Sequence, residues 1–347
     1  MTGSNDSWKE IIAAFDANIA VYLKQLKLHG NSKHFNATFW DTTESFTITR
    51  QVLIAAAGSI SHEITKFSMV HTKNPSVEEA QSMCKSLRKP CEQFFSAVKT
   101  ALFCGVGPSL AASIVQSSIR IFHSLRELTT ALQKEEMRRV PELTGRIWDS
   151  CKSVEEIPTS NHASFQRNTL ETLSMLGDSI KELKECLEAT KETDLDLVEL
   201  EDDFDFDATV SSEDRSAVIL GVRILEMFGA ILKGGALVLT RVSNALNSAS
   251  GDNAELIIWT SLLDRQYTQS RNIVIDVSAA LYPPIEADDL HTHLQHFSAQ
   301  VDELFTTFSS QPDISDGTLR LWQKKRAKFQ GEFEEFQAQV AALRESM

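Results

Sequence analysis

The stretch "SLAASIVQSSIRIFHSLRELTTAL", residues 109–132, decides the fold because its large apolar residues recur at the spacing of an α-helix. These residues are Leu110, Ile114, Ile121, Leu125, Leu128 and Leu132. Steps of three, four and seven place them on one helix face, which a globular protein buries. The preceding "CGVGPS" (104–109) contains two glycines and a proline, so it predicts the end of one helix and the start of the next.

The same period continues through most of the chain. It recurs after position 46 in Phe46, Leu53, Ile60, Ile64 and Phe67, and after position 256 in Leu256, Trp259, Leu263, Tyr267, Val274, Val277 and Leu281. Strand signals are nearly absent, since the chain has no sustained period-two alternation and no Asn-Gly hairpin turn. The sequence therefore predicts an all-α fold.

Ten helices are expected, and several of them span about 28–37 residues, or roughly 42–55 Å. Helices of this length with short connections pack as antiparallel bundles. Asn74 and Pro75 predict an N-cap followed by proline at the first helical position, and Pro90 predicts a kink. The expected ranges are 6–29, 37–72, 75–102, 108–138, 142–156, 160–190, 212–248, 252–281, 286–309 and 314–345.

The longest stretch without helix caps is acidic and is expected to divide the chain. It includes "ETDLDLVELEDDFDFD" (192–207), in which nine of the residues are carboxylates and none is Lys or Arg. Such a segment cannot bury enough apolar surface to offset its ordering entropy. We therefore expect an N-terminal helical bundle over 1–190, an acidic linker over 191–211 and a C-terminal helical bundle over 212–347.

Other interpretations of the acidic segment differ in what they require. An EF-hand needs glycine at the sixth position of its loop, where a loop starting at Asp194 has Glu199. Paired catalytic acids need a desolvated cleft, which a run of like charges in water does not provide. A segment that binds a groove on a partner or on this chain stays open as the alternative to a solvated linker. Its candidate residues are Asp194, Asp196, Glu199, Glu201, Asp202, Asp203, Phe204, Asp205, Phe206 and Asp207.

The net charge of −14 restricts the classes of partner. A globally acidic protein repels phosphates, so broad nucleic-acid binding is not expected. The most apolar run, residues 217–242, contains Arg223, Glu226, Lys233 and Arg241, which excludes a typical membrane span. The five cysteines have irregular spacing and no CxxC pair, so we expect free, mostly buried thiols.

Two further stretches are candidates for partner binding. One is a leucine-zipper-like stripe, for which bundle core is the competing interpretation. It consists of Leu173, Leu176, Ile180, Leu183 and Leu187. The other is the basic "RLWQKKRAKF" (320–329), which could also be a nuclear-import signal or a solvated helix face. Its basic residues are Arg320, Lys324, Lys325, Arg326 and Lys328.

No arrangement of residues points to catalysis or to a bound metal. "HTHLQH" holds His291, His293 and His296, but no pair of them has the i, i+4 spacing that metal-binding histidines on a helix prefer. "GVGPSL" lacks the lysine and the preceding strand of a phosphate loop. We therefore predict no catalytic, metal or cofactor residues, and a protein that is not an enzyme.

Four stretches together resemble the cyclin-D-binding protein family, also called the GCIP, HHM or Maid family. In order, they are "FWDTTESFTITRQVLIAAAGSISHE" (39–63), "GVGPSLAASIVQSSIRIFHSL" (105–125), "VPELTGRIWDSCKSVEEIPTSN" (140–161) and "ALYPPIEADDL" (280–290). An acidic tract lies between the third and the fourth, as in the family, although here Leu, Val and Phe interrupt it. The resemblance covers roughly residues 35–310.

The resemblance implies an all-helical, non-enzymatic protein of cytoplasm and nucleus. It also implies binding to D-type cyclins and helix-loop-helix transcription factors, with negative control of cell-cycle progression, and it carries no catalytic residues. Binding would place an apolar helix stripe in a groove. The alternative expectation is a cytoskeletal or scaffold adaptor, because long antiparallel helices also resemble the bundles of vinculin and α-catenin.

Overall fold

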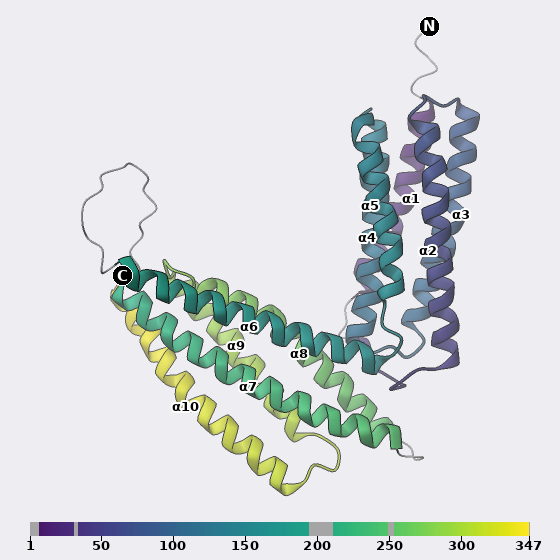
Figure 1. Cartoon of the computed structure of the whole chain (residues 1–347). Coiled ribbons are helices and arrows are strands. Elements are labelled where there is room, and N and C mark those ends of the chain that lie inside the picture. Colours follow the sequence, from purple (N-terminus) through teal and green to yellow (C-terminus); the bar gives the residue numbers. More distant parts are fainter. Residues whose placement is uncertain (1–6, 31–33, 194–210, 249–252, 347) are drawn as a thin grey trace, which may run out of the picture. The chain divides into compact units, whose positions relative to one another are not determined.

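The computed structural model describes residues 7–30, 34–193, 211–248 and 253–346. These residues form ten α-helices and two short 3-10 helices, and the described part of the chain contains no strand (Figure 1). The predicted all-α fold is therefore confirmed. The helices are α1 (Ser7–His29), α2 (Glu44–His71), α3 (Val77–Leu102), α4 (Pro108–Gln133), α5 (Val140–Lys152), α6 (Asn161–Thr193), α7 (Ser212–Ser248), α8 (Ala254–Ala280), α9 (Ala287–Ser309) and α10 (Asp316–Ser346).

Local capping decides where two of these helices begin. α2 starts at Glu44 rather than near position 37, because Thr43 is extended and its side chain accepts a hydrogen bond from the Phe46 amide at 3.2 Å. α3 starts after Ser76, whose hydroxyl and the Glu79 carboxylate form a capping box. The predicted N-cap at Asn74 is therefore wrong, and this residue instead adopts a φ of 52°.

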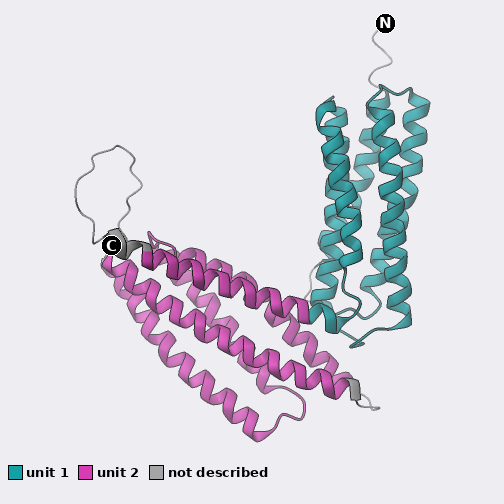
Figure 2. Cartoon of the chain, viewed as in Figure 1, with its two compact units in different colours: residues 1–165 teal, residues 166–347 magenta. Residues whose placement is uncertain are grey.

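Unit 1, residues 1–165, contains α1 to α5, which lie side by side (Figure 2). Its core takes apolar residues from all five helices, and Ile12, Phe67, Leu87, Ile114 and Leu143 in it are fully buried. One polar link lies at its edge and is partly buried: the Arg126 guanidinium donates two hydrogen bonds to the Asp16 carboxylate, at 3.0 and 3.1 Å. This pair joins α1 to α4.

A glycine turn connects α3 to α4 within unit 1. Gly105 has a φ of +88°, and a Cβ there would lie 1.8 Å from the Thr38 hydroxyl oxygen. The Thr38 amide donates to the Gly105 carbonyl at 3.0 Å, so the two backbones touch. The 104–109 stretch is thus the predicted break between helices. Ala37 and Thr38 lie against it, and α2 begins only at Glu44.

Unit 2, residues 166–347, contains the rest of α6 and all of α7 to α10. Its core is rich in aromatic contacts, and the Trp322 and Phe308 rings stack with centroids 4.2 Å apart. The Trp259 indole donates to the Thr307 carbonyl at 2.8 Å, and the Tyr267 hydroxyl donates to the Leu232 carbonyl. These bonds satisfy polar groups that the surrounding side chains shield from water.

The division between the units falls inside α6. The sequence analysis expected it near the end of this helix. α6 packs with the helices that follow it: the Asn168 amide donates to the Asp264 carboxylate at 2.9 Å, and Lys184 pairs with Glu226 at 2.5 Å. The expected boundary after residue 190 is therefore replaced by one after residue 165. The acidic residues 194–207 lie outside the described residues.

None of the helices in the described part of the chain combines the length and the hydropathy that a membrane crossing requires.

Candidate partner-binding groove

An open groove runs between α2 and α3 in unit 1. Two hollows of about 690 and 790 Å³ lie along these helices. They share four lining residues, so they form one continuous feature, which we call the α2–α3 groove. The shared residues are Ala55, Ser59, Lys89 and Gln93.

Small residues on two facing helices leave this space open. The α2 side follows one helix face, at steps of four and three residues, and contains Ile48, Val52, Ala55, Ser59 and His62. Gly58 lines the groove as well, and a Cβ added there would meet no heavy atom within 4 Å. This glycine is therefore not needed for close packing of neighbouring chain segments. Its missing side chain leaves space in the groove.

The groove is long enough for a helical ligand. Ile48 and His62 lie fourteen positions apart on α2, which corresponds to roughly 21 Å at 1.5 Å per residue. A partner helix of about four turns would cover this distance.

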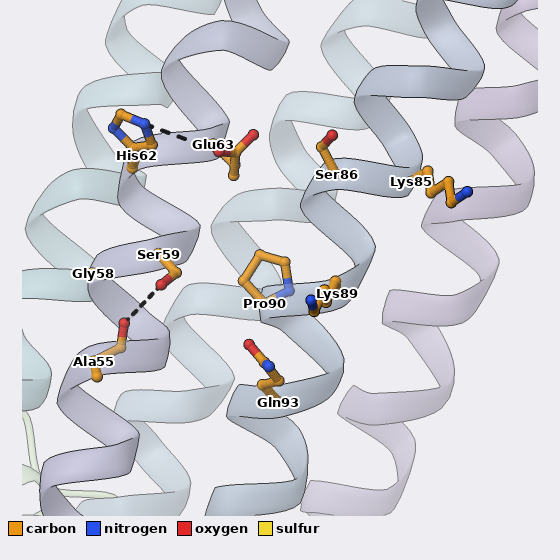
Figure 3. Close-up of a pocket in the computed structure, with 10 residues that line it drawn as sticks. All are labelled: Ala55, Gly58, Ser59, His62, Glu63, Lys85, Ser86, Lys89, Pro90 and Gln93. Carbon is orange, nitrogen blue, oxygen red and sulfur yellow. Dashed lines mark hydrogen bonds and ion pairs between the residues drawn. The ribbon is translucent and has the colours of Figure 1, made fainter.

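The two ends of the groove differ in polarity. At one end, Ile48 and Val52 are 52% and 47% exposed, which is unusual for two apolar residues one turn apart on a helix. Toward the other end, Lys85 and Lys89 on α3 are exposed, and Figure 3 shows Ser86 nearest to Glu63, Lys89 beside Pro90 and the Lys85 side chain pointing away from α2. Glu63 is already paired with Lys66 at 2.9 Å. The groove therefore offers an apolar contact at the Ile48 end, a lysine, Lys89, where the two hollows meet, and a second lysine, Lys85, beyond it.

Pro90 removes the usual helical donor of the Ser86 carbonyl. Proline has no amide hydrogen, so it cannot supply the helical hydrogen bond to the Ser86 carbonyl, four residues before it. Pro90 and Ser86 both line the groove (Figure 3). α3 nevertheless continues through this position from Val77 to Leu102. The carbonyl can accept a bond from water or from a ligand donor.

The leucine-zipper-like stripe on α6 lies mostly inside unit 2. Leu176 and Leu183 are 2% and 1% exposed, and Leu173, Ile180 and Leu187 are half-buried. A Cβ on Gly229 of α7 would lie 3.1 Å from the Leu176 side chain. In this arrangement the stripe contacts α7, and Leu176 and Leu183 are not accessible to a partner.

The basic stretch on α10 is divided by an internal contact. Arg326 pairs with Asp302 of α9 at 2.7 Å, and Lys325 is half-buried. Arg320, Lys324 and Lys328 are exposed and recur every four residues, so they form one basic ridge along the helix.

The histidines of the 291–296 stretch have polar neighbours. His293 lies 3.4 Å from Asp289, and His291 contacts Gln295 at 3.0 Å. Across the described residues, no three His, Cys, Asp or Glu side chains come together in a way that could hold a metal ion.

All five cysteines are free, and Cys84, Cys91 and Cys151 are buried. Desolvation raises the pKa of the Cys84 thiol to about 11 and that of the Cys151 thiol to about 12. Burial also raises the pKa of Cys91. Thiols of this kind are mostly protonated near neutral pH and react slowly as nucleophiles.

The sequence analysis did not single out the α2–α3 groove, although a signal for it was present. "AAAGS" (55–59) combines small residues with a glycine inside a helical pattern. A glycine at such a position costs helix stability, so it indicates a packing or binding requirement.

Comparison with known proteins connects the groove to a family. No curated protein matches the chain. Residues 52–189 match a family model described as "Grap2 and cyclin-D-interacting, N-terminal". The match confirms the resemblance noted in the sequence, and it contains nearly all of the α2–α3 groove. The family description names interactions and no reaction. Residues 52–189 of this chain are thus similar to the N-terminal domain of the Grap2 and cyclin-D-interacting family.

Proposed function

We propose that this protein is a non-enzymatic regulator that binds D-type cyclins and helix-loop-helix transcription factors through the α2–α3 groove. By holding these partners, it acts as a negative regulator of cell-cycle progression in the cytoplasm and the nucleus. The observation that carries the proposal is the position of the groove. An open, partly apolar groove lies within the segment that matches a cyclin-D-interacting family.

The groove suits one established mode of recognition. An amphipathic helix places its apolar face in a groove between two helices and is anchored by residues at i, i+3 and i+4. Here Ile48 and Val52 would contact such anchors, while Lys85 and Lys89 would face carboxylates near the other end of the ligand helix. Fully burying a Val or Ile side chain contributes about 1.5–3 kcal/mol, so the half-exposed pair could supply a substantial part of micromolar binding.

A substitution that fills the groove tests the proposal. Gly58→Leu places a side chain in open space and replaces a helical glycine, so the helix is expected to become more stable rather than less. Binding of a purified D-type cyclin, measured by titration calorimetry, should weaken about tenfold or more because the ligand loses its space. The matched control is Gly145→Leu on α5, where a Cβ also meets nothing within 4 Å, outside the groove. Equal effects of the two substitutions would contradict the proposal.

A second pair of variants tests the apolar end. Ile48→Ser with Val52→Ser should weaken binding of the cyclin and of a helix-loop-helix factor, and the two partners should compete for the chain. The control is Ile219→Ser with Leu237→Ser, two residues of α7 that are 50% and 67% exposed. If wild type binds neither partner and instead sediments with actin filaments, the protein belongs with the cytoskeletal adaptors that the sequence left as the alternative.

A further inference from the structure

Unit 1 has a second apolar surface, at the ends of α1 and α3. Leu28 is 70% exposed and Phe103 is 78% exposed, the two highest values among the large apolar residues of the described chain. Both line a hollow of about 350 Å³, which we call the Leu28–Phe103 surface. Its other lining residues are His29, His34, Phe35, Asn36, Lys99, Leu102, Gly105 and Val106. It shares none of them with the α2–α3 groove.

The exposure of these two residues is not required by the core. Leu28 lies in the last turn of α1, and Phe103 is the C-cap of α3. Polar residues are common at helix C-terminal ends, so neither position requires a large apolar side chain. Two large apolar side chains beside one hollow are an exposed patch of the kind that marks an interaction site.

The charge around this surface is positive, in contrast to the net charge of −14 of the chain. Residues 17–40 and residues 93–126 contain no Asp or Glu, and both stretches reach this surface. Lys24 and Lys27 on α1 and Lys99 on α3 are exposed, and none of them forms an ion pair with another described residue. The helix dipoles place a partial negative charge of only about half a unit at each of the C-terminal ends of α1 and α3, which is less than the charge of the three lysines.

We propose that the Leu28–Phe103 surface binds an acidic peptide segment of a partner protein, in which carboxylates alternate with large apolar side chains. The apolar side chains cover Leu28 and Phe103, and the carboxylates lie near Lys24, Lys27 and Lys99. A helix with one uniformly apolar face fits this surface less well, because Lys99 lines the hollow together with Leu28 and Phe103, and Lys24 and Lys27 precede Leu28 on α1. This site is separate from the proposed cyclin site, so each can be tested while the other is intact.

The test uses the full chain and a fluorescent peptide that repeats Asp-Phe-Glu-Leu. Fluorescence anisotropy should show binding that weakens about tenfold or more in Leu28→Ser with Phe103→Ser, since both apolar contacts are lost. Lys99→Glu should also weaken binding, and raising the salt concentration should weaken wild-type binding, because exposed charges are screened. Peptides that repeat Asn-Phe-Gln-Leu or Asp-Ser-Glu-Ser should bind less tightly, since each lacks one of the two contacts.

Matched substitutions elsewhere keep the test specific. Leu170→Ser on α6 changes a leucine that is 68% exposed, and Lys324→Glu on α10 reverses an exposed lysine. Neither should change binding. An equal loss in these controls, or no binding of the peptide to wild type, would overturn the proposal. The titration is repeated with Phe204→Ser and Phe206→Ser. Unchanged affinity supports a separate partner, whereas tighter binding would assign the surface to the chain's own acidic segment.

Discussion

The Asn161 side-chain carbonyl accepts a hydrogen bond from the Gly107 amide at 2.6 Å, across 54 positions of the sequence. The same side chain donates to the carbonyls of Phe39, at 2.8 Å, and Gly105, at 3.2 Å. One buried amide thus joins the first residue of α6, the turn before α4 and the segment before α2. These are three of the stretches on which the family resemblance rests, which gives the resemblance a structural basis at this end of unit 1.

Asn161→Ala should destabilise unit 1 strongly. The substitution leaves the buried Gly107 amide and the buried Phe39 carbonyl without this partner, while the Gly105 carbonyl still accepts from the Thr38 amide. An unsatisfied buried group costs about 1–3 kcal/mol. We expect a loss of roughly 2–4 kcal/mol, measured as a shift of the urea midpoint by circular dichroism. Asn18→Ala is the control, because the Asn18 amide only donates to the Ala14 carbonyl on its own helix. A comparable loss in both variants would show that the Asn161 contacts contribute little.

Helical periodicity predicted the fold class and most helix positions, because long apolar stripes are a strong local signal. The expected helix over 212–248 has the observed bounds of α7, and the expected helix over 314–345 is close to α10. Residues 37–43 were predicted as the first part of a helix over 37–72. These residues are not part of α2, because they make contacts with distant residues that the local sequence does not show. The His162 amide donates to the Trp40 carbonyl at 3.0 Å, and the His162 and Trp40 rings stack.

The domain boundary and the groove could not be derived from periodicity for a related reason. A stripe shows that a helix is buried but not which helix covers it, and only the structure shows that Leu176 faces Gly229. The acidic segment was therefore taken as the division, although α6 before it packs with α7 and α8. The α2–α3 groove likewise depends on small residues of two helices that face each other. Neither helix alone defines it.

Leu176→Ala should distinguish a core stripe from an exposed zipper on α6. Because Leu176 is 2% exposed, truncation should cost about 2–5 kcal/mol of the free energy of unfolding of unit 2. Leu170→Ala on the same helix, where the leucine is 68% exposed, should change it by less than about 0.5 kcal/mol. Urea unfolding followed by Trp322 fluorescence reports on this unit if the other four tryptophans are replaced by phenylalanine in both variants. Equal, small effects would show that the stripe is not packed.

The five thiols should react in two classes. At pH 8 we expect Cys104 and Cys186, which are partly exposed, to react promptly with a disulfide reagent such as DTNB. Cys84, Cys91 and Cys151 should react only after unfolding, because burial raises their pKa and blocks the reagent. Cys104→Ser with Cys186→Ser should therefore abolish the fast phase. A fast phase of more than two thiols in the wild type would contradict the burial of the other three.

His71 should make unit 1 less stable as the pH falls. Its ring is fully buried against Phe67 and Trp8, and its Nδ1–H donates to the Phe67 carbonyl at 2.7 Å. Desolvation lowers the pKa of His71 below its usual value, and the hydrogen bond to Phe67 only partly opposes this. The unfolded chain therefore binds a proton near pH 6.5 while the folded chain still excludes it. Stability contributed by neutral His71 is present above pH 6.5 and decreases below it, by at most about 1.4 kcal/mol per pH unit.

Urea unfolding between pH 8 and pH 5 measures this effect by comparison with His71→Phe. The phenyl ring keeps the contacts with Phe67 and Trp8 but cannot bind a proton, so the variant should lose less stability as the pH decreases. The other histidines are present in both proteins, so the difference between the two curves isolates His71. Parallel curves over the whole range would mean that His71 is as easily protonated in the folded chain as in the unfolded one. His123→Phe, at a histidine whose side chain is 66% exposed, is the control and should leave the difference between pH 8 and pH 5 nearly unchanged.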